Sequence, residues 1–113
     1  FQWSQAWGGS QNDSFAALAL DSADNIVLSA LSIGPIDFGG PTLSSAGLYD
    51  VTLAKLTPQG AHLWSRIFGS SGAEGHPAVS AREEILLAFP SAGACDLGTG
   101  PLPAGLTVAR FAP

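Results

Sequence analysis

With 113 residues, the chain is long enough for one domain with a buried core. Apolar residues make up 46% and charged residues only 12%, and the 14 glycines and 8 prolines favour compact β structure over disorder or long surface helices. The net charge of −5 excludes a basic surface for nucleic acid, and no apolar run reaches the roughly 18 residues of a membrane span. Because the chain lacks Met and begins at Phe1, we expect a processed piece or an excised domain.

A repeat organises the whole sequence. The stretch 3–10 (WSQAWGGS) returns 61 residues later as 64–71 (WSRIFGSS), with large aromatic residues and a glycine kept in register. Repeats of this length indicate one structural unit per copy. The sequence therefore predicts one domain over 1–113 built from two units, the first spanning about 3–63 and the second about 64–113.

Four strands are predicted for the first blade, the fourth of them running into the second repeat copy, and they are separated by two tight turns and one longer Gly/Pro loop. In chain order they lie in 15–20 (FAALAL), 26–31 (IVLSAL), 51–56 (VTLAKL) and 61–68 (AHLWSRIF). The turns are 21–25 (DSADN), where Asp and Asn side chains can bond their own backbone, and 57–60 (TPQG), where Gly60 allows unusual backbone geometry.

One alternative concerns the first of these strands. The Ala and Leu residues of 14–23 (SFAALALDSA) are strong helix formers, so a helix is also considered there. The copy in the second unit, 75–81 (GHPAVSA), places Pro77 where a helix interior would have to continue. This proline favours the strand.

The second unit repeats these blocks with small deletions in the loops between them, where length changes are best tolerated. The aligned segments are 17–20 with 78–81, 25–32 with 84–91, 37–41 with 96–101, and 51–56 with 106–111. Four strands per unit correspond to a blade. The predicted fold class is all-β, with two four-stranded antiparallel repeats.

Several motifs resemble the repeat of the bacterial seven-bladed β-propeller family of secreted and surface proteins, many of them myxobacterial. The motifs are 3–8 with its W…WG pattern, 20–30 (LDSADNIVLSA), 36–40 (IDFGG) and 50–64 (DVTLAKLTPQGAHLW). The second unit departs from this pattern at 80–84 (SAREE). The resemblance implies propeller blades, a secreted or cell-surface location, and a scaffold or interaction role, with no family catalytic residue to transfer.

Acidic residues give two candidate sites, each with a structural alternative. Asp21, Asp24 and Asn25 form an oxygen-rich loop that could hold a cation, although a plain turn is favoured because the spacing is not that of an EF-hand. Asp37 and Asp96 could in principle serve in acid–base chemistry, but they occupy equivalent positions ahead of glycines. A turn role explains both aspartates at once.

Other reactive residue types give no site. His62 and His76 have no ligand-type residue at metal spacing, and Cys95 has no neighbour in sequence that would activate its thiol. We therefore predict no catalytic residue, no metal site and no cofactor, and the chain is not expected to be an enzyme.

Three tryptophans are the remaining candidates for ligand binding. Trp3, Trp7 and Trp64 could stack on sugar rings, but their repetition at matched positions favours a packing role. The first functional hypothesis is a non-catalytic scaffold or protein-interaction module. The alternative is a glycan-binding, lectin-like propeller with sites repeated in each blade.

The order of the blocks predicts self-association. The chain begins with a copy of a blade's fourth strand, around Trp3, and ends with a copy of a third strand, around Val108. Two blades cannot close a ring, because propellers have roughly four to eight. We expect the strand around Trp3 to pair beside the strand around Val108, either in a ring of three or four chains or with further blades of a longer parent chain.

Overall fold

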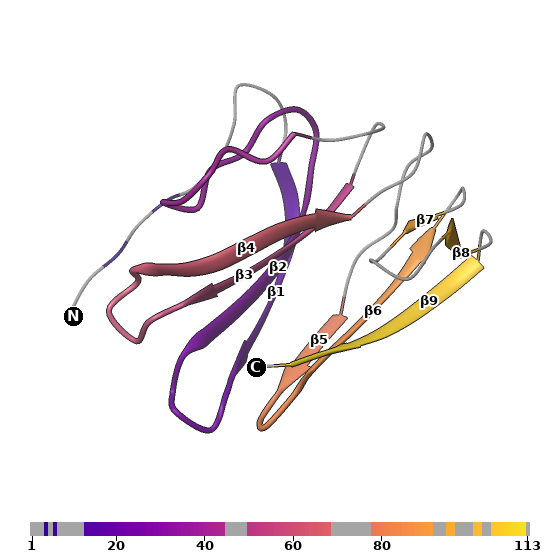
Figure 1. The fold of residues 1–113 in the computed structure, drawn as a ribbon. Coiled ribbons are helices and arrows are strands. Elements are labelled where there is room, and N and C mark those ends of the chain that lie inside the picture. The colour runs from indigo at the N-terminus through magenta and orange to yellow at the C-terminus, as the bar shows by residue number, and fades with distance from the viewer. Residues whose placement is uncertain are drawn as a thin grey trace.

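The computed structural model describes residues 4, 6, 13–44, 50–68, 78–91, 95–96, 101–102 and 105–112, and these form an all-β structure (Figure 1). The strands are β1 (Asp13–Leu20), β2 (Ile26–Ser32), β3 (Asp50–Leu56), β4 (His62–Phe68), β5 (Ala78–Ala81), β6 (Ile85–Ser91), β7 (Cys95–Asp96), β8 (Pro101–Leu102) and β9 (Gly105–Phe111). The predicted all-β class is confirmed. The stretch that was also considered as a helix, 14–23, lies in strand β1 up to Leu20.

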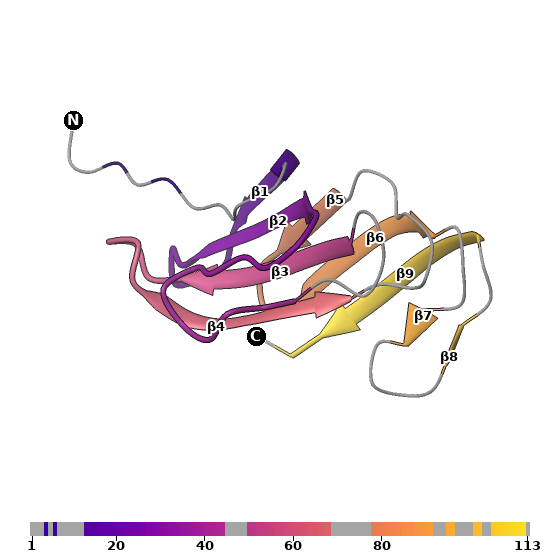
Figure 2. The same cartoon turned by 90° about the horizontal axis from the view of Figure 1, so that it is seen from above.

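The first sheet has four antiparallel strands in the order β1-β2-β3-β4. Each strand pairs with the next along the chain, so the sheet is a meander, as the sequence predicted (Figure 2). The turn between β3 and β4 forms by the expected mechanism. Gly60 has a φ of 88°, and the hydroxyl of Thr57 accepts hydrogen bonds from the backbone N–H groups of Gln59 and Ala61.

The second sheet has three antiparallel strands among the described residues, in the order β5-β6-β9. The strands β7 and β8, of two residues each, form a separate antiparallel pair inside a segment that the sequence predicted as a loop. The second unit thus lacks an outer strand in the described part of the chain. The predicted fourth-strand copy around Trp3 lies mostly outside the described residues, and Ser4 and Ala6 belong to no strand.

Each sheet has two distinct faces because side chains alternate along a strand. We call face A of the first sheet the one that carries Val27 and Leu31 of β2, Val51 and Leu53 of β3, and Phe68 of β4. Face B is the opposite side, which carries Leu18 and Leu20 of β1, Leu28 of β2, and Ala54 of β3. The same letters apply to the second sheet through the repeat alignment.

The two sheets pack head to tail. The main core joins face A of the first sheet to Ile85, Leu87 and Phe89 of β6. By the alignment these three residues correspond to Ile26, Leu28 and Ala30, which lie on face B of the first sheet. Face A of one unit therefore covers face B of the next, as in the successive stacking of repeat proteins.

The loop that follows β2 covers part of face B of the first sheet. Ile36 and Phe38 are buried with Ala54 in a second, smaller core, and Leu28 packs against it. Farther along the same loop, a Cβ at Gly40 would overlap the imidazole of His62 on β4. The loop thus occupies the β3–β4 side of face B, whereas β1 stays uncovered, with Leu18 and Leu20 exposed.

Replacing Gly40 by alanine is expected to destabilise the protein by about 0.5–1 kcal/mol, because the new methyl group must turn the partly exposed His62 ring aside. In a His62→Ala background, the same Gly40→Ala change should cost almost nothing. Urea unfolding of the two single variants and the double variant measures both steps. An equal cost in the two backgrounds would contradict the proposed overlap.

Candidate interaction surface

The acidic loop 21–25 is stabilised internally. The Oδ1 atom of Asp21 accepts hydrogen bonds from the backbone N–H of Ala23 at 2.8 Å and of Asn25 at 2.9 Å. Its Oδ2 atom accepts one from Asn25 Nδ2 at 3.1 Å and lies 2.8 Å from the Lys55 ammonium. Asp24 adopts the left-handed conformation with a φ of 63°. This geometry supports a turn rather than a cation loop, because protein donors surround the carboxylate.

The ion pair sets the charge state of Asp21. The ammonium of Lys55 and the hydrogen bonds from Asn25 and Ala23 hold the pKa of the Asp21 carboxyl well below its ordinary value, against the opposing effect of desolvation. Both side chains are nearly buried, at 9% and 5% exposure. The backbone N–H of Ser22 also donates to the carbonyl of Arg82, which ties the two hairpin loops together. Asp21 therefore has a structural role.

The other sequence candidates are not brought together. Asp37 accepts a hydrogen bond from the backbone N–H of Gly39 at 2.6 Å, a turn geometry, and His62 lies 2.9 Å from the hydroxyl of Ser65. His76 lies outside the described residues, and Cys95 and Asp96 are placed in β7 without described side chains. Among the described residues, no group of three or more His, Cys, Asp and Glu could hold a metal ion. The described part contains no helix long and apolar enough to span a membrane.

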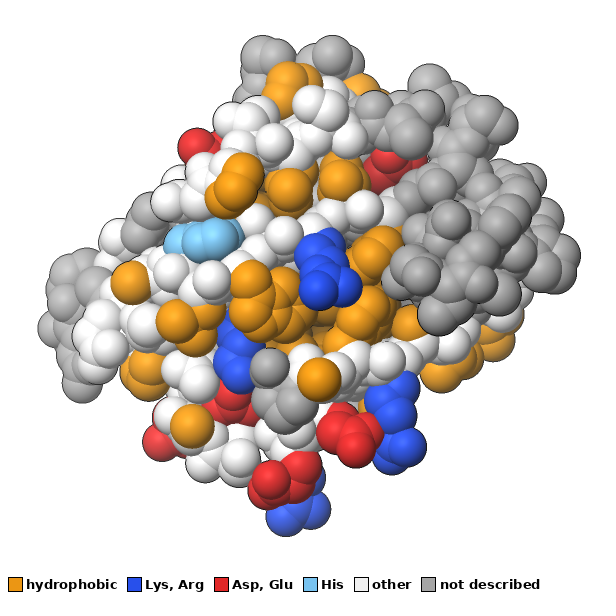
Figure 3. All heavy atoms as spheres, viewed as in Figure 1, with side chains coloured by type: hydrophobic (Ala, Val, Ile, Leu, Met, Phe, Trp, Pro, Cys, Tyr) orange, Lys and Arg blue, Asp and Glu red, His pale blue; other side chains and the backbone are white. Residues whose placement is uncertain are grey.

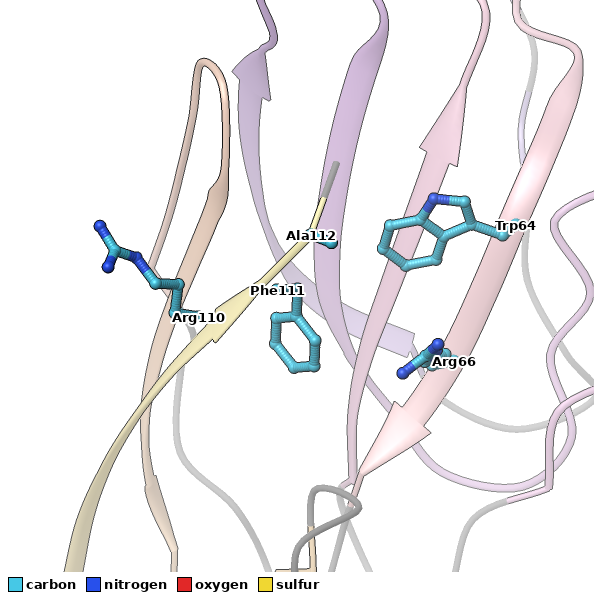
Figure 4. Close-up of a pocket in the computed structure, with 5 residues that line it drawn as sticks. All are labelled: Trp64, Arg66, Arg110, Phe111 and Ala112. Carbon is cyan, nitrogen blue, oxygen red and sulfur yellow. The ribbon is translucent and has the colours of Figure 1, made fainter.

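Trp64 is the only one of the three candidate tryptophans that the structure describes, since Trp3 and Trp7 lie outside the described residues. Its indole packs against the main core, and the Arg66 guanidinium lies 5.8 Å from the ring centroid. Beside it is a cavity of about 540 Å³ between β4 and β9. Figure 4 shows Trp64 and Phe111 directed into this space, whereas Arg110 points to the other side of β9.

This cavity marks the junction between the two sheets. The Phe111 ring stacks on Phe68 with a centroid distance of 5.4 Å, which fixes β9 next to β4. In Figure 3, hydrophobic side chains gather in the middle of this side of the molecule, with basic side chains among them. Within the described residues β9 is an edge strand of the second sheet, so its outer backbone hydrogen-bonding groups have no described strand beside them.

Face A of the second sheet carries apolar side chains that no described residue covers. Leu106 and Val108 are 75% and 66% exposed, whereas their equivalents in the first unit, Val51 and Leu53, are both 0% exposed. Leu86 of β6 is also exposed on this face. The difference arises because the second sheet covers face A of the first, while no described residue covers face A of the second. Exposed apolar patches of this kind indicate interaction surfaces.

Two ion pairs at corresponding ends of the two sheets show the same asymmetry. Lys55 and Asp21 have side chains 9% and 5% exposed, whereas Arg110 and Glu84, which pair at the corresponding end of the second sheet, are 72% and 47% exposed. Arg110 aligns with Lys55 in the repeat, whereas Glu84 aligns with Asn25 rather than with Asp21. The second sheet thus carries a similar ion pair, and no described residue covers it.

The sequence predicted self-association but not this surface, because both faces of the predicted strands are apolar. The repeat alignment is the signal that could have found it. Once face A of the first unit is known to be buried, the alignment identifies the residues that form face A of the second unit. The candidate site is therefore a pair of apolar sheet faces rather than a cluster of reactive groups. Comparison of the chain with family models, with curated proteins and with solved structures gave no match.

Proposed function

We propose that this chain is a two-blade segment of a β-propeller that serves as a non-catalytic scaffold or protein-interaction module of an exported or surface bacterial protein. The exported location and the bacterial source rest on the resemblance of the repeat motifs alone. The single observation that supports the β-propeller architecture is the head-to-tail packing of the two units. Face A of the first sheet meets face B of the second, as successive blades must do around an axis.

The non-catalytic role is supported by the structural contacts that the polar candidate residues make. Asp21 is held by Lys55 and its own loop, and Asp37 closes a turn. The glycan-binding alternative depends on the tryptophans. The Trp64 ring is half-buried against the core and lines the cavity between the two sheets, with Arg66 beside it, which is a packing position rather than an open platform for a sugar. For this reason the scaffold takes precedence over the lectin.

Fusing three or four copies of the chain in tandem tests the architecture. Three copies supply six blades and four copies supply eight, both within the roughly four to eight blades that close a propeller. We expect at least one of these fusions to form a ring with a central channel, because closure buries every apolar face. Electron microscopy of the purified fusions shows the shape directly. Open rods or stacks for both fusions would contradict the propeller assignment.

A further inference from the structure

The geometry points to one specific contact between chains: face A of the second sheet binds the β1 side of face B of the first sheet in a second copy of this chain. This inference rests on the proposed scaffold function and names its partner and its two surfaces. The two surfaces are different from each other and lie on opposite sides of the molecule.

The internal interface provides the template for this contact. Inside the chain, β5 lies against β1 and β2, and its residues Val79 and Ala81 pack onto the main core. The repeat alignment equates Val79 with Leu18 and Ala81 with Leu20. Leu18 and Leu20 are 66% and 54% exposed, and no described residue covers them. At these two positions the first unit therefore presents larger apolar side chains than the second unit does. These leucines are the inserting half of the contact.

The receiving half is an apolar groove on the second sheet. Its volume is about 300 Å³, and its lining includes Leu86 and Val108 together with the small residues Ala78 and Ala88. Leu86 and Val108 align with Val27 and Leu53, which belong to the core that receives Val79 and Ala81 inside the chain. The groove is therefore the second unit's copy of a surface that is already occupied in the first.

The loop 33–44 restricts the contact to one side. Ile36 and Phe38 cover the β3 side of face B, so an incoming second sheet can reach only β1 and the neighbouring part of β2. In the internal interface the equivalent strand of the second unit, β5, packs against the first sheet, so the open strand β1 can make the same kind of contact. Because the two surfaces differ, the contact is heterologous, and each chain can use both surfaces at once. Repeated association of this kind gives either a closed ring or an open filament.

Two charge-introducing double variants separate the surfaces. Leu86→Glu with Val108→Glu disables the receiving groove, and Leu18→Glu with Leu20→Glu disables the inserting strand. Leu63→Glu is the matched control, since Leu63 is an exposed leucine of β4 outside both surfaces. Sedimentation velocity of the full chain at micromolar concentration measures the mass. We expect the unmodified chain and Leu63→Glu to associate alike, and each double variant to associate at least tenfold more weakly.

Mixing the two double variants is the decisive step. Each retains the surface that the other lacks, so an equimolar mixture should form a one-to-one dimer and no larger species. This recovery also shows that both variants are folded. A monomeric unmodified chain, or a mixture without the dimer, would overturn the inference. So would a groove variant that still self-associates as strongly as the unmodified chain.

The outcomes keep this inference apart from the proposed function. If a tandem fusion closes into a ring while the free chains stay monomeric, only the contact between free chains is wrong. If the mixture forms its dimer while both fusions give open rods, the contact stands and the propeller assignment fails.

Discussion

Replacing Leu87 by alanine is expected to lower the free energy of unfolding by about 3 kcal/mol, within the usual range for a fully buried leucine. Leu87 is completely buried on β6, at the junction where the second sheet meets face A of the first. Its removal leaves a cavity between two sheets that cannot close without shifting a whole strand. Urea unfolding monitored by tryptophan fluorescence measures the loss.

Leu28→Ala is the matched control, because Leu28 occupies the same position in the first unit. Leu28 is only partly buried and is covered by the loop residues Ile36 and Phe38 rather than by a sheet. We expect the Leu28→Ala change to cost about 1 kcal/mol, since a loop relaxes around a small cavity more easily than a packed sheet does. An equal loss of unfolding free energy at the two positions would show that face B is covered equally in both sheets. That result would contradict the head-to-tail packing.

Most of the secondary structure was predictable from local sequence. Alternating side chains and β-branched residues identified the strand 51–56, and Pro58 with Gly60 identified the turn that follows it. The loop 21–25 also forms as predicted, since Asp21 bonds its own backbone. These features depend on residues close together in the chain, so sequence reasoning reaches them without knowledge of the tertiary contacts.

The packing of one sheet on the other was not predictable in the same way. Val27 and Leu28 are adjacent and both apolar, so the period-two pattern does not say which face meets the second sheet. The partner of Lys55 could not be predicted either, because Asp21 lies 34 residues away, in the loop between β1 and β2. The hairpin of β7 and β8 was missed because strands of two residues leave no periodic signal.

Exchanging Asp21 for asparagine should destabilise the protein by roughly 3 kcal/mol at neutral pH. The amide oxygen can still accept the backbone hydrogen bonds at the loop, but the nearly buried Lys55 ammonium loses its counter-charge. Removal of one member of a buried ion pair is costly because the remaining charge stays desolvated. The free energy of unfolding at pH 7, measured by urea titration of both proteins, gives the difference.

The same exchange should change how stability depends on pH. Because the folded state holds the pKa of Asp21 below its ordinary value, the ion pair contributes fully above about pH 4, where the carboxyl is ionised even in the unfolded chain. As the pH falls below about 4, the unfolded state binds a proton first and the contribution is lost. The gap between the unmodified protein and Asp21→Asn should therefore narrow in acid.

Glu84→Gln provides the comparison at the equivalent end of the second sheet. Its partner Arg110 is largely exposed, so loss of this pair should cost only about 0.5 kcal/mol, as for surface ion pairs in general. The contrast between the two exchanges follows from the asymmetry of the packing, in which one face A is covered and the other is open. A Glu84→Gln cost as large as that of Asp21→Asn would mean that face A of the second sheet is already covered in solution. In that case the cost of Glu84→Gln should fall when Leu18→Glu and Leu20→Glu disable the proposed covering strand.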